Sequence, residues 1–308
     1  FEVRIYDTGP STAVIPVQNL IHSGTLKDAQ VIIGPLYAAA FRPVAEYASK
    51  LGIPVLNPFG KSPPQVSEPP QIRITPAQAS YVESLARYLA LKYQFGRILF
   101  VNGAPGRDTA FVRALGEATE KALQKVRPTG KVFYRVNSVQ EIGSALDPSS
   151  ENLIYYPSTR ETAVNSFLNQ LRALQKNIPL AVLGDESWLA FSTADLDFFS
   201  QVRLRIPVQN FVTRGDTLFD RFYNFCQKEF GTEPDFYAFR AYDILCYVMD
   251  VLENYGHLTA ECLEKESRRY LLSPIKLQRI PGTEVWENKG ISVLTLMHND
   301  LFFETFGD

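Results

Sequence analysis

The residues whose spacing suggests a binding site lie around Gly34-Pro35, where a short apolar run ends. This run, residues 31–33, is typical of a β-strand. A helix-like segment follows the Gly-Pro pair and ends at Gly52, before a second apolar run at 53–56. Strand–helix–strand units bind ligands at the carboxyl ends of their strands, where backbone amides at the start of the helix are exposed. The chemistry that this spacing indicates is binding and not catalysis.

Side chains that commonly catalyse reactions or bind metals are scattered along the chain. His22, His257 and His298 are far apart and have no partners at metal-ligand spacing. No G-x-S-x-G or H-E-x-x-H motif is present. The sequence therefore predicts a protein that is not an enzyme and that has no metal or cofactor. A carboxylate pair formed in the fold from any two of the 33 acidic residues is the alternative left open.

Cysteine spacing gives no redox or zinc motif. Cys226, Cys246 and Cys262 show no C-x-x-C arrangement, and three cysteines allow at most one disulfide, whose members the sequence leaves open. Cys246 lies in an apolar helix-like run, where a small buried side chain is expected.

A glycine-containing turn suggests phosphate binding at first sight. Gly103-x-x-Gly106-Arg107 follows an apolar strand-like run. The turn lacks the Lys-Ser/Thr pair of a P-loop and the third glycine of a dinucleotide-binding fingerprint. Phosphate binding is therefore not expected here.

Size and charge favour a globular protein with two cores. The chain has 308 residues, of which 45% are hydrophobic, and a net charge of −2. Interspersed acids and bases predict no nucleic-acid partner and no anionic membrane surface. No stretch approaches the roughly 20 apolar residues of a transmembrane helix, so no transmembrane segment is expected.

Strands and helices alternate in two successive series, which predicts two doubly wound α/β domains. The expected strands are 2–6, 31–33, 53–56 and 72–75 in the first series and 97–103, 131–136, 152–157 and 180–184 in the second.

Three helix starts are marked by capping residues. Thr75 and Gln78 fit a capping box with Pro76 at the first helical position, and Ser158 with Glu161 fits another. Asp108 is expected to cap a third helix. The proline-rich loop 57–70 is interpreted as a solvent-exposed connector.

The last third of the chain does not extend the second series. A strand near 202–212 precedes two helices, 218–229 and 236–254, without a strand between them, and the final 30 residues are β-rich. The chain is therefore expected to return to the first lobe and to end on the second. The predicted first lobe is 1–95 plus 213–270, and the second is 96–212 plus 271–308, joined by a multi-strand hinge.

Several strings resemble one family. VIIGPLYAAAFRPVAEYASKLGIPVLNPF is similar to the first lobe of type I periplasmic solute-binding proteins, the Leu/Ile/Val-binding family, and RILFVNG resembles the strand that opens their second lobe. GDESW and FYAFRAYDILCYVMDVLENYG resemble two later family segments. The resemblance implies two doubly wound, Rossmann-like lobes. Gly34-Pro35-Leu36 also resembles the variant found in lipoprotein activators of penicillin-binding proteins and in LysM-linked lipoproteins.

The resemblance also implies a missing unit. The family begins with one more strand and helix, and that strand is central in the first sheet, whose order is 2-1-3-4-5. We interpret the first strand–helix unit as omitted from the sequence or disordered, with replacement by another segment as the alternative.

The resemblance implies a ligand site between the lobes. Its expected residues are Tyr37, Ala38, Ala39, Phe59, Gly60, Thr75 and Gln78 from the first lobe and Pro105, Tyr156 and Asp185 from the second. Asp185 would hold a ligand ammonium, and Tyr156 would stack on an apolar group. Alanines stand at 38 and 39 where the family usually has Ser or Thr, which weakens the case for an amino-acid carboxylate. Helix capping by Thr75 and Gln78 and a plain surface role for Asp185 are the alternatives.

Two functions follow from this resemblance. The first is capture of a small polar, amino-acid-like ligand for a membrane permease of an ABC importer. The second is an envelope lipoprotein domain with a degenerate pocket that contacts a cell-envelope protein or the cell wall. Both imply the periplasm or the cell envelope, with a signal or lipid anchor removed.

Overall fold

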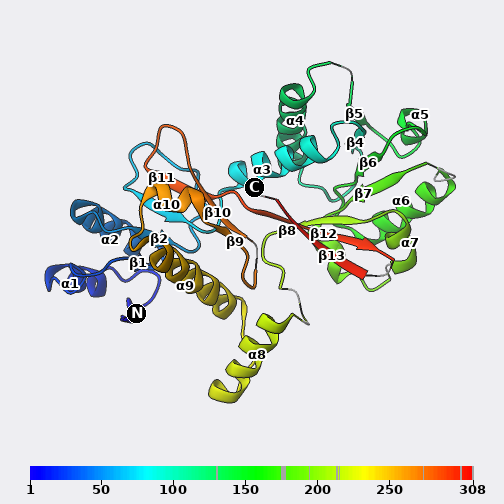
Figure 1. The fold of residues 1–308 in the computed structure, drawn as a ribbon. Helices are drawn as coiled ribbons and strands as arrows, with labels where there is room; N and C mark the ends of the chain where they lie inside the picture. Colours follow the sequence, from blue (N-terminus) through cyan, green and yellow to red (C-terminus); the bar gives the residue numbers. More distant parts are fainter. Residues whose placement is uncertain are drawn as a thin grey trace. The chain divides into compact units, whose positions relative to one another are not determined.

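The computed structural model describes residues 1–129, 131–174, 178–193, 195–212, 214, 216–272, 274–298 and 300–306. These residues form two compact units (Figure 1). Unit 1 contains residues 1–81 and 210–290, and unit 2 contains residues 82–209 and 291–306. The chain therefore passes between the units three times within residues 1–306, and the first passage falls within one helix.

Unit 1 contains a six-stranded sheet of order β1-β2-β3-β11-β10-β9. Strands β1, β2, β3 and β11 are parallel, whereas β10 is antiparallel to both of its neighbours. The strands are β1 Ile32–Ile33, β2 Val55–Asn57, β3 Gln71–Arg73, β9 Ser267–Arg268, β10 Ile275–Arg279 and β11 Val285–Asn288. The helices are α1 Ile15–His22, α2 Ala38–Leu51, the start of α3 Gln78–Lys92, α8 Thr217–Phe230, α9 Phe236–Tyr255 and α10 Ala260–Lys265.

Helices cover both faces of this sheet. Val55 on β2 packs with α1 and α2 residues such as Val17 and Phe41. The next residue, Leu56, packs on the opposite face with residues of α9 such as Tyr247. Because successive side chains of a strand point to opposite faces, this one strand contributes to both hydrophobic cores, as a doubly wound sheet requires.

Helix α2 follows the sequence prediction closely. Its buried residues recur at the helical spacing: Ala40, Phe41, Val44, Ala45 and Ala48. The helix ends at Gly52, which has φ +69° and donates its N–H to the carbonyl of Ala48. Glycine adopts this left-handed conformation without steric cost, so the predicted helix end is confirmed.

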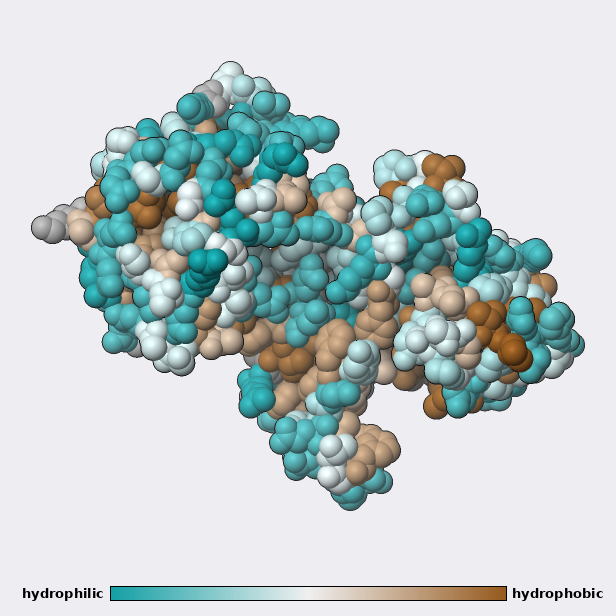
Figure 2. All heavy atoms as spheres, turned by 180° about the vertical axis from the view of Figure 1, so that it is seen from behind, coloured by the Kyte–Doolittle hydropathy of each residue, from teal (hydrophilic) through white to brown (hydrophobic). Residues whose placement is uncertain are grey.

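Helix α8 leaves part of its apolar surface exposed. Phe219 and Cys226 are buried, whereas Phe225 and Phe230 are 53% and 69% exposed. The rings of these two exposed residues contact each other edge to face, with centroids 6.0 Å apart. Figure 2 shows apolar patches among hydrophilic ones on the surface of α8, which is the lowest part of that view.

Unit 2 contains a seven-stranded sheet of order β13-β12-β8-β7-β6-β4-β5. Strands β5, β4, β6, β7 and β8 are parallel, and β12 and β13 add an antiparallel pair. The strands are β4 Arg97–Val101, β5 Phe133–Val136, β6 Asn152–Tyr155, β7 Leu180–Leu183, β8 Arg205–Val208, β12 Ile291–Met297 and β13 Asp300–Phe306. The helices are the rest of α3, α4 Thr109–Val126, α5 Ile142–Ala145, α6 Glu161–Leu174, the 3-10 helix η1 Glu186–Ala190 and α7 Leu196–Gln201.

The central strands of unit 2 are buried along their whole length. Every residue of β6, β7 and β8 is buried. Burial along the whole strand is typical of parallel strands covered on both faces. None of the helices in the described part of the chain has the length and apolar character needed to cross a bilayer.

The strand predicted at 2–6 is wrong. These residues form no strand, and the side chains of Val3 and Ile5 are 62% and 90% exposed. Among the described residues, β1 pairs only with β2. Residues 2–6 therefore form no hydrogen-bonded ladder with a neighbouring strand. Alternation of apolar residues stabilises a strand only when a neighbouring strand is present.

The assignment of residues 271–290 to the second lobe is also wrong. Strand β11 pairs in parallel with β3, and β10 pairs with β11, so both belong to unit 1. Residues 82–95, predicted in the first lobe, belong to unit 2. Helices α8 and α9 lie in unit 1. The division of the chain into units depends on pairing between strands that are about 200 residues apart. Local sequence patterns do not predict such pairing.

Candidate functional site

The site residues predicted in the first lobe lie after three neighbouring strands of unit 1. Tyr37, Ala38 and Ala39 follow β1, Phe59 and Gly60 follow β2, and Thr75 and Gln78 follow β3. Because β1, β2 and β3 are parallel and adjacent, their carboxyl ends meet at one edge of the sheet. The structure thus brings these residues to one edge, whereas their role in ligand binding remains a prediction.

The exit from β1 leads into the start of α2. Gly34 has φ +87° and donates its N–H to the carbonyl of Leu56 at 2.8 Å, and the Gly34-Pro35 peptide is cis. Tyr37 is the N-cap residue of α2, and its carbonyl accepts the N–H groups of Ala40 and Phe41. The helix therefore starts directly after this turn.

The first residues of helix α2 are exposed. Ala38 and Ala39 are exposed, and Tyr37 is 46% exposed. The first N–H groups of a helix have no intrahelical acceptor, and the helix dipole places partial positive charge beside them. This turn therefore favours an anionic group through its backbone, and it offers no hydroxyl donors at positions 38 and 39.

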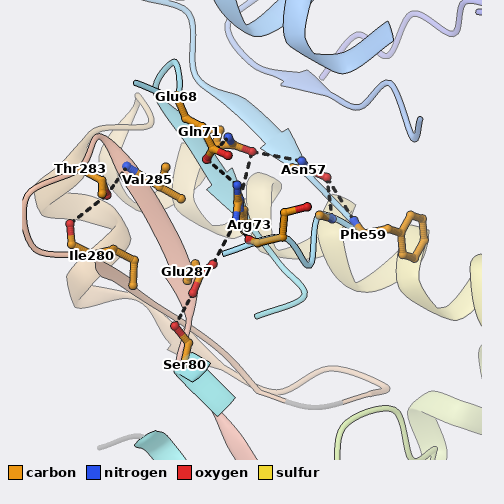
Figure 3. Close-up of polar contacts among 12 residues, drawn as sticks. Asn57, Phe59, Glu68, Gln71, Arg73, Ser80, Ile280, Thr283, Val285 and Glu287 are labelled. Carbon is orange, nitrogen blue, oxygen red and sulfur yellow. Dashed lines mark hydrogen bonds and ion pairs between the residues drawn. The ribbon is translucent and has the colours of Figure 1, made fainter. Parts of the chain in front are cut away.

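Asn57 shapes the turn after β2 (Figure 3). Its side-chain oxygen accepts the N–H groups of Phe59 at 3.3 Å and of Gly60 at 2.8 Å. Its Nδ2 donates to Oε1 of Gln71 at 3.1 Å. A Cβ atom at position 60 would lie 2.4 Å from Asn57 Nδ2, so any side chain here would force the Asn57 side chain to move.

Phe59 connects this turn to helix α9. Its ring centroid lies 6.0 Å from that of Phe236 and 5.5 Å from that of Tyr237. Tyr237 is 62% exposed, so the aromatic cluster is open to solvent on one side. The cluster can supply apolar contacts to a ligand bound at this edge.

A buried arginine organises the loop between β2 and β3 (Figure 3). Arg73 is 3% exposed and forms ion pairs with Glu68 and with Glu287, the latter at 3.3 Å. It also donates to the carbonyl of Ser62. Glu287 is fully buried and accepts the hydroxyl of Ser80 on α3. The loop interpreted as a plain solvent-exposed connector is thus tied to the sheet from inside.

Sequence reasoning missed this network. Gln71 and Arg73 flank Ile72 in a strand whose three residues are all buried. Long polar side chains in a buried strand of a parallel sheet need buried polar partners. The presence of Gln71 and Arg73 in this strand could therefore have indicated the network.

The predicted capping box at Thr75 is wrong. Helix α3 begins at Gln78, and the Thr75 hydroxyl donates to the carbonyl of Pro58 at 2.7 Å. Thr75 is 5% exposed, whereas Gln78 is exposed in the first helical turn. Thr75 therefore joins the exits of β2 and β3, because a tertiary acceptor competes with the helix for its hydroxyl.

The site residues predicted in the second lobe follow three neighbouring strands of unit 2. Pro105 follows β4, Tyr156 follows β6, and Asp185 follows β7. These strands are parallel and adjacent, so the three residues also share one sheet edge.

Ser158 ties these exits together. Its hydroxyl donates to the carbonyl of Pro105 at 2.6 Å, and its carbonyl accepts the indole N–H of Trp188 at 2.7 Å. Its hydroxyl also accepts the N–H of Arg160, but Glu161 binds Thr193 instead of the Ser158 backbone. The second predicted capping box is therefore wrong, whereas the Asp108 cap is confirmed by bonds from the N–H groups of Ala110 and Phe111.

Tyr156 and Asp185 are partly engaged within unit 2. The ring of Tyr156 stacks on Phe167 with centroids 4.0 Å apart, the residue is 4% exposed, and burial raises the pKa of its phenol. Asp185 is half-buried and caps η1 by accepting the N–H of Ser187 at 2.9 Å. A ligand would meet little of the Tyr156 ring, and the Asp185 carboxylate is already engaged in capping the 3-10 helix.

No metal centre accompanies these edges. The described residues contain no group of three or more metal-ligating side chains. Cys226, Cys246 and Cys262 are all free thiols, and the first and third are buried.

Comparison with known proteins identifies the fold. No protein-family model matches the sequence, and no curated protein sequence matches it. Among solved structures, a protein of Rhodospirillum rubrum described as a branched-chain amino acid ABC transporter is similar, with a TM-score of 0.55, 15% identity, and coverage of 94% of this chain and 84% of that chain. Full-length LpoA of Haemophilus influenzae has a TM-score of 0.55, 13% identity, and coverage of 94% and 51%. The LpoA C-domain, described as a regulator of PBP1A, has a TM-score of 0.51, 13% identity, and coverage of 94% and 86%. The chain therefore has the α/β fold of the type I periplasmic binding proteins.

Proposed function

We propose that this chain is a non-catalytic binding protein of the periplasm or cell envelope. It captures a small, amino-acid-like ligand and delivers it to the membrane permease of an ABC importer. The observation that carries this proposal is the exposed start of α2, where the amides of Ala38 and Ala39 stand at the carboxyl ends of β1, β2 and β3. Backbone donors at a helix start suit a ligand carboxylate. The proposal also assigns Asp185, the acidic residue after β7, to a ligand ammonium.

Substitution at Ala38 tests the carboxylate contact. Proline fits the first position of a helix, and Tyr37 has φ −96° and ψ 133°, which suits a residue before proline. Ala38→Pro therefore removes one amide donor while the helix is retained, and Ala38→Ser is the control that keeps the donor. In a thermal-shift panel of amino acids, the wild type and Ala38→Ser should be stabilised by the same ligand, and Ala38→Pro should not. A flat response of the wild type across the panel would count against transport.

Substitution at Asp185 tests the ammonium contact. Asn caps helices about as well as Asp, so Asp185→Asn should leave the unfolding temperature of the free protein unchanged. Loss of the charge should weaken ligand binding about tenfold or more, since about 1.4 kcal/mol corresponds to a factor of ten. Isothermal titration with the amino acid found in the panel measures this change. Equal affinities for the wild type and Asp185→Asn would exclude an ionic role for Asp185.

A second function rests on a different observation. Several side chains expected to bind ligand are engaged inside the protein: the Thr75 hydroxyl bonds to Pro58, the Asp185 carboxylate caps η1, and the Tyr156 ring stacks on Phe167. This supports a non-transport envelope lipoprotein domain with a degenerate pocket, which contacts a cell-envelope protein or the cell wall. Co-sedimentation with purified peptidoglycan tests the cell-wall contact. Retention in the pellet, together with a flat amino-acid panel, would favour this function over transport.

A further inference from the structure

Each of the two sheets has two edge strands, and one of these four strands differs from the others. Strands β1 and β9 have two residues each, and β5 has four and carries Arg135. Strand β13 has seven residues and contains no Lys, Arg or Pro. Proteins protect sheet edges from pairing with other chains by keeping them short or by placing lysine or proline on them. Of these four edges in the described part of the chain, β13 is therefore the longest, and its charged residues are Asp300 and Glu304.

The register shows which backbone groups of β13 point outward. Leu296 on β12 donates its N–H to the carbonyl of Leu204, in the same register that joins β12 to β8. Backbone groups alternate sides along a strand, so odd-numbered residues of β12 point toward β13. Residues 291, 293, 295 and 297 lie opposite 306, 304, 302 and 300. The N–H and C=O groups of Leu301 and Thr305 consequently point away from β12, toward the edge.

The inner side of β13 is firmly held. Glu304 binds Lys92 and Arg205, both at 2.9 Å, and accepts the hydroxyl of Tyr88 at 3.0 Å. The ring of Phe306 contacts Tyr88, with centroids 5.6 Å apart. On the same strand Leu301 and Phe302 are 57% and 45% exposed. The strand is thus fixed against β12 and α3, while the apolar side chains of Leu301 and Phe302, which point to opposite faces of the sheet, stay exposed.

We propose that β13 pairs with β13 of a second copy of this chain, as an antiparallel dimer contact. A twofold axis at position 303 places Leu301 of one copy opposite Thr305 of the other, and these residues exchange their outward N–H···O bonds. The same register sets Asp300 opposite Phe306 and Phe302 opposite Glu304. No like charges face each other across the contact, so the edge is complementary to itself.

The small area of this contact limits the affinity of the dimer. Seven residues of strand span about 23 Å, so the contact buries less surface than a stable interface needs. Dimerisation is therefore expected to be weak and concentration-dependent.

Sedimentation velocity of the full chain, from about 5 to about 500 micromolar, tests the proposal. Thr305→Pro removes the outward N–H without removing a bond to β12, and edge strands tolerate proline at such positions. Thr305→Ala is its matched control, which keeps the N–H. Leu301→Lys adds a charge to the edge by a separate route. The wild type and Thr305→Ala should dimerise as concentration rises, and Thr305→Pro and Leu301→Lys should stay monomeric with near-wild-type circular dichroism.

Two results would overturn the proposal. One is a wild type that stays monomeric over the whole range. The other is a dimer that forms equally well in Leu301→Lys, which also decides the matter if Thr305→Pro does not fold.

Discussion

Nη1 of Arg73 lies 3.3 Å from Oε1 of Glu287, and 214 residues separate the two in the chain. Arg73 is on β3 and Glu287 is on the neighbouring strand β11, and both side chains are almost fully buried. The pair therefore joins two neighbouring strands in the middle of the unit 1 sheet, one before α3 and one after α10 in the chain. Through Glu68 and the Ser62 carbonyl it also anchors the loop that follows β2.

Removal of one partner of this ion pair should lower the stability of the protein. Arg73→Met keeps much of the side-chain volume but leaves the carboxylate of Glu287 buried without its cation. Such a change typically costs about 3–5 kcal/mol in the free energy of unfolding. Urea denaturation measures this cost.

Two further variants serve as controls. Arg42→Met breaks an exposed ion pair with Glu46 within α2, so it should change stability by no more than about 0.5 kcal/mol. The double variant Arg73→Met/Glu287→Leu replaces both charges and should recover much of the loss. Equal effects of Arg73→Met and Arg42→Met would contradict the importance of the buried pair.

The turn after β2 should tolerate no side chain at position 60. In Gly60→Ala the added Cβ would lie 2.4 Å from Asn57 Nδ2, so the Asn57 side chain must move and release the amides at 59 and 60. We expect a loss of about 1–3 kcal/mol in stability and faster hydrogen exchange at these two amides.

Gly143→Ala is the matched control for this turn. There the added atom would meet only the end of the Leu174 side chain, at 3.3 Å. Its effect on stability and exchange should be small. Unchanged exchange at position 60 in Gly60→Ala would show that the Asn57 turn does not depend on glycine.

Local sequence patterns were sufficient for the parts of the fold that depend on neighbours in the chain. The apolar spacing of α2 and its glycine end at Gly52 predicted a helix that the structure confirms. The same reasoning failed for residues 2–6, because a strand depends on a partner that the segment itself does not encode. It failed for β10 and β11 because their place in unit 1 depends on pairing with β3, which is distant in the sequence.

In the candidate site, too, features that depend on neighbouring residues could be predicted, whereas features that depend on tertiary contacts could not. Apolar runs predicted where β1, β2 and β3 end, and the family resemblance indicated the candidate residues that follow them. The hydroxyl of Thr75 had two possible acceptors, a nearby helix amide and a carbonyl brought near by folding, and the sequence showed only the first. The bond to Pro58 required knowledge of the tertiary structure.

Thr75→Val separates these two roles of the hydroxyl. Valine has nearly the same shape, so its main effect is to leave the Pro58 carbonyl without its buried donor. We expect a loss of about 1–3 kcal/mol and faster exchange in the loop after β2, with the start of α3 unaffected. Thr75→Ser, which retains the hydroxyl, is the control. Faster exchange confined to the first turn of α3 would restore the capping role.

A buried carboxylate in α9 should make unit 1 sensitive to pH. Asp243 is fully buried, and its oxygens accept the N–H groups of Leu271 and Leu272, each at 2.9 Å. Burial raises the pKa of this carboxyl to about 6, although the two amides and Arg240 act in the opposite direction. The folded protein therefore binds a proton at Asp243 more tightly than the unfolded chain does.

The sign of the pH effect follows from this difference. A carboxyl whose pKa is higher in the folded state contributes stability that is present below its unfolded pKa and is lost as pH rises through about 6. The side chain introduced by Asp243→Asn does not titrate. When the stabilities of the wild type and this variant are compared, the contributions of the other carboxyl groups to the pH dependence cancel. From pH 4 to pH 7 the wild type should lose stability relative to Asp243→Asn by up to about 3 kcal/mol. Urea denaturation at several pH values measures this difference. A difference that does not vary with pH would mean that the amides of Leu271 and Leu272 offset the burial, and that Asp243 titrates near its ordinary range.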